Sequence, residues 1–462
     1  MKHLILIILS FLLLNVYSQT EQYLYYSLNN FNGNRVILTS IIGSSNIPID
    51  TAYKQSTGAF VFNNIEKHPA GMYRLIFNDT IYTEIIINHE NIVIESDANN
   101  IIQNMVVKKS IENKILFNYW KYALMVRDTI STLSFKRDKI EKRTYDSKHP
   151  EIIKINKHIE ELNDEIYYYI ERQIIEYPKL FAPLLLKSYV IPSMEKYNKQ
   201  NPKKLYSVEK EFYFDHFFDN IDFSDQRFVN SKVLFVSISD FIETFGKPAS
   251  TVNYIKVIDR VMSHAKENNA VYDYCVNLFM RTFENSIWED VMVHIIDNYY
   301  MKTNNGKPKL GVYYSNMSNR IKALKPGVKS PNIIMQDMSG NTVNMHNINA
   351  KVKMLIFYSS DCPHCIESMP SLVEIYNMYK SKGLETIGIA LDDTKSKWAN
   401  KIKELNINWI SISDLKGMSS PIISTYNITT TPTIIILNKD NIIMTKPKNI
   451  NDIHATLVEL LN

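Results

Sequence analysis

Residues 353–370 read KMLIFYSSDCPHCIESMP and contain two cysteines, Cys362 and Cys365. The apolar residues before the cysteines are typical of a buried strand, and the residues from Cys362 onward follow a helical pattern. Residues three apart on the first turn of a helix share a face, so the two thiols can close a disulfide and open again. Pro363 fits this turn because proline loses no hydrogen bond at the first helical position. The stretch therefore predicts a strand, a thiol–disulfide site and a helix.

Cys362 is the expected attacking thiol, and Cys365 is the expected resolving thiol. A helix N-terminus carries roughly half a positive charge, which stabilises a thiolate at Cys362. A free thiol with a pKa of about 8.5 is only a few per cent thiolate at pH 7, so a lower pKa supplies nucleophile directly. Pro363 sets the helix start and a protonated His364 adds positive charge, whereas a nearby Asp361 carboxylate opposes the thiolate. We expect the helix N-terminus and His364 to dominate.

A Cys-x-x-Cys pair is also half of a structural zinc site, which needs two further ligands. The chain has one other cysteine, Cys275, and the histidines nearest the redox region, His346 and His454, are isolated from one another. We therefore expect no metal. Cys275 lies in an apolar helical context, where a free cysteine behaves as a small hydrophobic residue.

The composition excludes one broad class of function. A chain of 462 residues is long enough for two to four domains, and its formal net charge is only +4. It has no basic run with interleaved aromatic residues of the kind that binds phosphates, so we expect no nucleic-acid partner.

The first residues are typical of a secretory signal peptide. Lys2 and His3 precede an apolar stretch over residues 4–16, and residues 16–18 are Val-Tyr-Ser, which suits a signal peptidase. The stretch is short for a bilayer span, so we expect cleavage before Gln19, with an uncleaved anchor as the alternative. The absence of a nearby cysteine argues against a lipoprotein. The expected location is the periplasm, where so few cysteines imply a fold that does not depend on structural disulfides.

The pattern of apolar residues predicts a multidomain chain. Residues 1–18 form the signal peptide. Residues 19–98 contain short β-branched and aromatic runs separated by turn residues, which predict a small antiparallel β-sandwich. Residues 99–302 repeat apolar positions every three or four residues and predict an all-α region. Residues 303–326 are expected to be a linker. Residues 327–462 alternate apolar runs with helical segments, which predicts an α/β fold with a mostly parallel sheet.

The last 135 or so residues resemble the thioredoxin superfamily, and within it the exported TlpA/ResA-type thiol–disulfide oxidoreductases. The matching pieces are residues 330–333, Gly340, the strand at 353–358, the Cys362 to Cys365 site, Pro370, the insert at 384–405 with Trp398, and Thr431-Pro432-Thr433. The resemblance implies a thioredoxin-like fold, protein disulfides or dithiols as substrates, a membrane thiol partner and no cofactor. It also implies a cis bond at Pro432, with Thr431 pairing to the substrate backbone. The preceding β and helical regions resemble segments of unknown function found before such domains.

Two positions depart from the resembled pattern. Ile356 stands where thioredoxin has a buried acid, and Ser368 stands where the TlpA/ResA helix has one, with Glu367 one position away. The dipeptide Pro363-His364 is that of the strongly oxidising DsbA group, whereas the surrounding sequence resembles reductases. The direction of electron flow therefore stays open, because partner proteins decide it.

Two other functions compete with an oxidoreductase. A peroxiredoxin-type peroxidase has the same fold and needs a proline and a Thr or Ser before the reactive cysteine. Ser359 is present, but Leu355 occupies the position of the proline. The second alternative is a redox-controlled binding or scaffold protein of the cell envelope, in which the first 300 residues hold a ligand.

Overall fold

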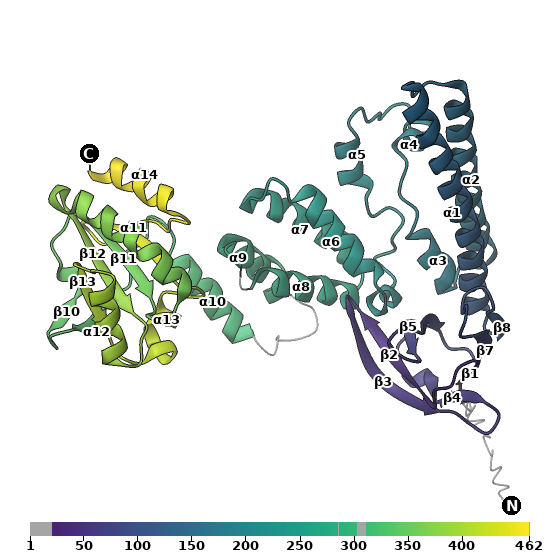
Figure 1. Cartoon of the computed structure of the whole chain (residues 1–462), viewed down its shortest axis with the longest axis horizontal. Helices are drawn as coiled ribbons and strands as arrows, with labels where there is room; N and C mark the ends of the chain where they lie inside the picture. The colour runs from purple at the N-terminus through teal and green to yellow at the C-terminus, as the bar shows by residue number, and fades with distance from the viewer. Residues whose placement is uncertain (1–20, 285, 303–310, 462) are drawn as a thin grey trace, which may run out of the picture. The chain divides into compact units, whose positions relative to one another are not determined.

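The computed structural model describes residues 21–284, 286–302 and 311–461, and it divides into two compact units, residues 1–274 and 275–462. Figure 1 shows the elements of each unit coloured in chain order. The predicted signal peptide lies outside the described residues. No helix in the three described ranges is long and apolar enough to span a membrane.

The first unit begins with two four-stranded sheets that share one core. One has the order β4-β1-β7-β8 and the other β3-β2-β5-β6. The strands are β1 (Tyr23–Asn29), β2 (Arg35–Ile42), β3 (Ser45–Tyr53), β4 (Ala59–Asn63), β5 (Gly71–Ile76), β6 (Tyr82–Ile87), β7 (Ile92–Asp97) and β8 (Val106–Lys109), with a 3-10 turn at Ile65–Lys67. Buried residues alternate along β1, and along β2 the alternation shifts by one residue at Leu38 and Thr39, where the pairing with β3 is irregular. The two sheets contribute residues to one shared core. The predicted sandwich is confirmed.

One pairing in this sandwich differs from the antiparallel prediction. Strand β1 runs parallel to β7, and every other described pair in the two sheets is antiparallel. The chain passes through five other strands between β1 and β7, so no tight turn forces these two strands to run in opposite directions.

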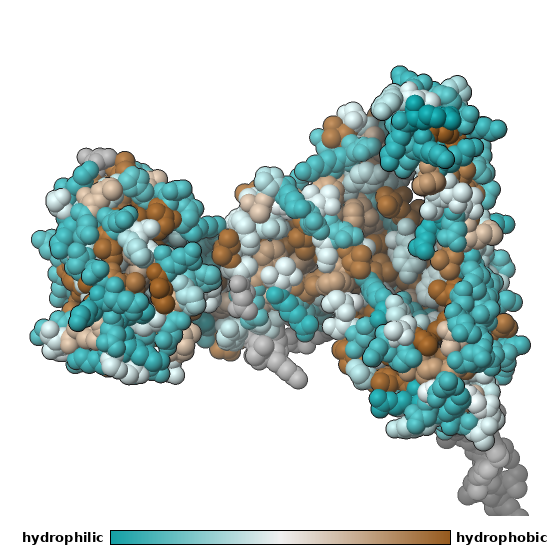
Figure 2. All heavy atoms as spheres, viewed as in Figure 1, coloured by the Kyte–Doolittle hydropathy of each residue, from teal (hydrophilic) through white to brown (hydrophobic). Residues whose placement is uncertain are grey.

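Helices follow in the first unit, as the apolar spacing predicts. They are α1 (Ile111–Thr144), α2 (Pro150–Glu176), α3 (Phe181–Lys187), α4 (Met194–Gln200), α5 (Glu209–His216), α6 (Val233–Phe245) and α7 (Thr251–Ala265), with a 3-10 turn at Gln226–Asn230. Helix α8 (Asn269–Phe283) contains the boundary between the units. On the face seen in Figure 2, hydrophilic residues cover much of the α1–α2 pair, whose far end is held by a small cluster of Ile140, Ile152 and Ile155.

The second unit contains a seven-stranded sheet with the order β10-β9-β13-β12-β11-β14-β15. Its strands are β9 (Ile334–Asp337), β10 (Thr342–Asn344), β11 (Val352–Tyr358), β12 (Leu384–Ala390), β13 (Ile410–Ser413), β14 (Thr433–Asn438) and β15 (Ile443–Thr445). Its helices are α9 (Glu289–Asn298), α10 (Gly311–Ala323), α11 (Pro363–Tyr379), α12 (Lys395–Glu404), α13 (Pro421–Thr425) and α14 (Ile450–Leu461), with 3-10 turns at Tyr300–Lys302, Met345–Asn347, Lys380–Lys382 and Gly417–Ser419.

The expectation of a mostly parallel sheet is wrong. Only the pairs β11–β12 and β12–β13 are parallel among the described pairings of this sheet. The strands at both edges belong to hairpins, β9–β10 and β14–β15, and a hairpin connection can join only antiparallel strands.

Strand β11 is buried along its whole length and leads directly to the cysteines. Met354, Ile356 and Tyr358 lie in the core on one face of the sheet, together with residues of α11 and α14. Leu355 and Phe357 lie in the core on the other face. Burial on both faces explains the continuous apolar run of β11. It also holds in place the end of β11, which the active-site loop follows.

The stretch 303–326, expected to be a linker, contains helix α10. Tyr314, Met317 and Ile321 of α10 are buried, and their spacing is that of one helix face. Helix α10 packs against α9. Residues 303–310, the polar part of the stretch, lie outside the described residues. Helix α9, assigned by the sequence to the helical region, is in the second unit, where Glu289 accepts hydrogen bonds from Asn427 and Lys446.

Candidate active site

The two cysteines lie at the N-terminus of α11, directly after the end of β11. Cys362 is the N-cap residue, and its Sγ accepts a hydrogen bond from the backbone N–H of Cys365 at 3.2 Å. The backbone N–H of Cys362 donates to the carbonyl of Ser359 at 3.2 Å, which closes the loop from β11 into the helix. Both thiols are free. Cys365 is buried with 1% exposure, whereas Cys362 is partly exposed and accessible to a substrate.

The loop before β14 lies beside the cysteines. The Thr431–Pro432 peptide bond is cis, as the resemblance implied. The thiol of Cys362 donates to the carbonyl of Thr431 at 3.3 Å, although the two residues are 69 positions apart. Strand β14 runs antiparallel to β11 with Thr433 opposite Phe357, and this pairing brings the loop to the end of β11. Thr431 and Pro432 are both half-buried.

The environments of the two thiols move their pKa values apart. Burial alone would raise the pKa of Cys362, but hydrogen bonds with Cys365 and Thr431 and from the backbone N–H groups of Cys365 and His364 hold it below its ordinary value. Burial raises the pKa of Cys365, and its hydrogen bond to Cys362 raises that pKa further. Cys362 therefore ionises first, and Cys365 keeps its proton.

Pro363 and His364 occupy the first turn of α11, and both are exposed. The contribution of His364 that the geometry shows comes from its backbone: the N–H lowers the pKa of Cys362, and the carbonyl accepts from Ser368 Oγ at 2.8 Å. The pKa-lowering effect expected of the His364 imidazole stays a prediction.

Asp361, the residue expected to oppose the thiolate, forms an ion pair. Its Oδ2 lies 2.8 Å from Lys397 Nζ, which comes from α12. The lysine offsets the charge of the carboxylate beside Cys362. This pairing could not be predicted from the sequence, because Lys397 lies 36 positions further along the chain.

A buried polar network lies on the core side of the site. Trp398 Nε1 donates to Tyr358 Oη at 3.2 Å and to Ser411 Oγ at 3.0 Å, and the two hydroxyl oxygens are 3.0 Å apart. Burial raises the pKa of Tyr358 to about 12, so its hydroxyl stays protonated. The network attaches α12 to the end of β11, next to the cysteines.

Comparisons with known proteins agree with this geometry. A thioredoxin-like family model matches residues 349–443. Thiol-disulfide oxidoreductase ResA of Bacillus cereus is 30% identical over 120 residues, which cover 26% of this chain and 68% of that protein. The chain belongs to the ResA family of thiol-disulfide oxidoreductases.

The chain is also similar to other proteins with related names. ResA of Bacillus subtilis is 21% identical over 118 residues, covering 26% of this chain and 64% of that protein. A thiol:disulfide interchange protein from Bacteroides sp. is similar in structure with 26% identity and a TM-score of 0.29, over 30% of this chain and 92% of its own. A thioredoxin-like protein from Bacteroides caccae has 18% identity and a TM-score of 0.46, over 59% of this chain and 98% of its own.

The ResA-type domain lacks acids at the two positions noted in the sequence. Ile356 is fully buried in the core. Ser368 donates to backbone carbonyls of its own helix, and Glu367 is exposed to solvent. Neither position supplies a buried carboxyl group to the thiols.

A buried carboxyl group that the sequence analysis missed comes from the next strand instead. Asp392 follows β12 and is 4% exposed. Its oxygens accept from the backbone N–H of Ser360 at 3.0 Å and from Ser360 Oγ at 2.8 Å. Strands β11 and β12 are parallel, so their carboxyl ends meet at one edge of the sheet, and a polar residue after β12 was the available signal.

The described residues offer no group of three or more His, Cys, Asp or Glu side chains that could hold a metal ion. His346 Nε2 lies 3.0 Å from the carbonyl of Ser330, and His454 Nδ1 lies 3.1 Å from Tyr379 Oη. Cys275 is fully buried, and burial raises the pKa of its thiol to about 12, as expected for an inert apolar residue.

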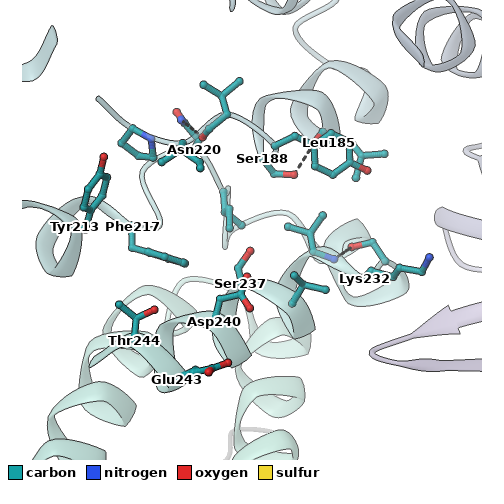
Figure 3. A pocket seen from close by; sticks show the side chains of 18 of the residues that line it. Leu185, Ser188, Tyr213, Phe217, Asn220, Lys232, Ser237, Asp240, Glu243 and Thr244 are labelled. Atoms are coloured by element: carbon teal, nitrogen blue, oxygen red, sulfur yellow. Dashed lines mark hydrogen bonds between the residues drawn. The ribbon is translucent and has the colours of Figure 1, made fainter. Parts of the chain in front are cut away.

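A separate cavity of about 900 Å³ lies in the first unit. Figure 3 shows Ser237, Asp240 and Thr244 of α6 along one side and Tyr213 and Phe217 along another. The described residues that line it include no cysteine. The alternative function, in which the first 300 residues hold a ligand, is not tested by this cavity.

Proposed function

We propose that this oxidoreductase exchanges electrons with protein disulfides through the Cys362/Cys365 pair. The observation that carries the proposal is the contrast between the two sulfurs at one helix N-terminus. Cys362 is accessible with a lowered pKa, and Cys365 is buried with a raised pKa. Such a pair suits an attacking thiolate and a protonated resolving thiol.

The exchange has two steps. The Cys362 thiolate attacks one sulfur of a substrate disulfide, the substrate S–S bond breaks, and the other substrate sulfur leaves as a thiolate that takes up a proton. Cys365 then loses its proton and attacks Cys362 Sγ, which releases the second substrate thiol. The Cys362–Cys365 disulfide carries the oxidation, and the substrate has gained two electrons and two protons. The reverse sequence oxidises a substrate dithiol.

Thr431 and Pro432 are the proposed contacts for the substrate backbone. Support comes from the Thr431 carbonyl, which lies 3.3 Å from the sulfur that attacks and belongs to a half-buried segment. A substrate strand paired with Thr431 would place its disulfide next to Cys362.

The lowered pKa of Cys362 favours an oxidising pair, because it stabilises the reduced thiolate form. Export by the segment at residues 1–18 and a membrane thiol partner are part of the proposal, with the periplasm as the compartment. The signal-like sequence supports export.

Reduction of insulin disulfides by dithiothreitol tests the proposed reaction. Catalytic amounts of the wild type should accelerate it, and Cys362→Ser should abolish the acceleration, whereas Cys275→Ser, which removes the buried cysteine, should leave it unchanged. Equal acceleration by wild type and Cys362→Ser would refute the proposal. Equilibration of the pair with glutathione then gives its reduction potential and the favoured direction.

A further inference from the structure

Asp392 is a buried acid held in a fixed place beside the active-site loop. The backbone N–H of Leu391 donates to the carbonyl of Tyr358 at 2.7 Å, which extends the β11–β12 ladder to the residue before the acid. The carbonyl of Asp392 accepts from the N–H of Gly417 at 3.3 Å. The backbone is thus attached on both sides, and the carboxylate has both oxygens bonded to Ser360.

Ser360 belongs to the short loop that delivers Cys362 to the helix. In this loop, residues 359–361, the Ser359 carbonyl accepts from the Cys362 N–H, and the Asp361 carboxylate pairs with Lys397 at the surface. Exposed ion pairs contribute little to stability. The two hydrogen bonds between Ser360 and Asp392 are buried, and they hold the loop to the end of β12. Ser360 is 4% exposed, so loss of the Asp392 carboxylate would leave its buried donors without an acceptor.

We propose that Asp392 is a positioning residue for thiol exchange, which holds residues 359–361 through Ser360 so that Cys362 Sγ stays in reach of its hydrogen-bond partners. The partners that favour the thiolate are the backbone N–H groups of Cys365, at 3.2 Å, and His364. The carbonyl of Thr431 lies 3.3 Å from the same sulfur and accepts from it only while the thiol is protonated. The inference rests on the proposed role of Cys362 as the attacking thiol.

Asp392 has two opposite effects on the pKa of Cys362, one through its charge and one through its hydrogen bonds to the loop. A carboxylate near the site disfavours a thiolate, whereas correct placement of the sulfur favours it. Burial raises the pKa of Asp392, and the charged or titratable groups around it are Asp361, Lys397, Tyr358 and the adjacent Asp393. The sign of the change in the thiol pKa therefore distinguishes positioning from charge.

The test measures the pH dependence of iodoacetamide alkylation at Cys362 in the reduced full-length protein, with the site identified by peptide mass spectrometry. Asp392→Ala removes the attachment and should raise the midpoint by about half a unit, which slows alkylation at pH 7 about threefold. Asp392→Asn keeps an acceptor oxygen without the charge and should leave the midpoint unchanged or lower. A midpoint that falls or stays constant in Asp392→Ala would overturn the proposal.

Two further variants keep the test decisive. Ser360→Ala removes only the hydroxyl bond and should raise the midpoint by a smaller amount; if Asp392→Ala does not fold, an unchanged midpoint in Ser360→Ala overturns the proposal. Asp393→Ala removes an exposed neighbouring carboxylate and should not raise the midpoint. Insulin reduction by the wild type tests the proposed function separately, because the alkylation midpoint is measurable whether or not the protein turns over insulin.

Discussion

At the scale of single residues, the local environment gives two chemically identical thiols different pKa values. Cys362 and Cys365 are three positions apart, yet their pKa values move in opposite directions because one accepts several hydrogen bonds and the other is buried. The motif predicted the pair and its order of attack. It could not predict the Lys397 partner of Asp361 or the buried Asp392, because both contacts join segments that are distant in sequence.

His364→Ala should raise the thiolate pKa of Cys362 by about half a unit and make the disulfide less oxidising, because a nearby imidazolium favours the thiolate. The backbone N–H that also lowers this pKa is retained in the variant. Thiolate absorbance of the reduced protein, titrated against pH, measures the change. His158→Ala, which removes an exposed histidine of α2, is the control. An unchanged or lower pKa in His364→Ala would show that the imidazole does not tune the site.

Lys353 is a buried base whose charge makes stability depend on pH. It donates to Asn441 Oδ1 at 2.6 Å and to the Met345 carbonyl at 3.2 Å, and burial lowers its pKa from 10.5. Between the lowered value and 10.5 the unfolded chain binds more protons than the folded chain, so stability rises with pH in this window.

Lys353→Met should be less stable than the wild type by about 1 to 3 kcal/mol, because Asn441 loses its buried donor. The difference in free energy of unfolding between the two proteins should grow as pH rises toward 10.5, because only the wild type is stabilised by the deprotonation of Lys353. Urea denaturation at several pH values measures it. A constant difference across the window would contradict the assignment.

At the scale of elements, local sequence patterns were sufficient to predict those helices and strands whose structure depends on one chain segment alone. The apolar run of β11 and the proline at the start of α11 are of this kind. The prediction of a mostly parallel second sheet was wrong, because the direction of each pairing depends on which strands become neighbours. Helix α10 was missed because its buried residues, Tyr314, Met317 and Ile321, find their partner on α9.

Glu112 shows how one side chain can connect two helices. It lies in the first turn of α1 with 1% exposure and accepts from the N–H groups of Phe181 and Ala182 at the start of α3, at 2.8 and 2.6 Å. Glu112→Ala should destabilise the first unit by about 2 to 3 kcal/mol, because two buried donors lose their acceptor. Denaturant unfolding followed by circular dichroism measures the loss. Glu151→Ala in the first turn of α2 is exposed and should change stability by less than about 0.5 kcal/mol.

At the scale of the whole molecule, the proposed redox site lies in the second unit. The cysteines, the cis Thr431–Pro432 bond and the buried Asp392 all lie within residues 275–462. The first unit has its own core and its own cavity. The sequence could point to a redox site because the Cys-x-x-Cys motif is local, whereas the first unit contains no such motif from which to predict a role.

The most direct test of the central claim is trapping of mixed disulfides in cells that express the full-length protein. Cys365→Ser leaves the attacking sulfur without its resolving partner, so it should accumulate mixed disulfides that disappear on reduction and map to Cys362. Cys362→Ser lacks the attacking sulfur, and its buried Cys365 should trap almost nothing. Equal trapping by the two variants, or trapping by Cys362→Ser alone, would contradict the account.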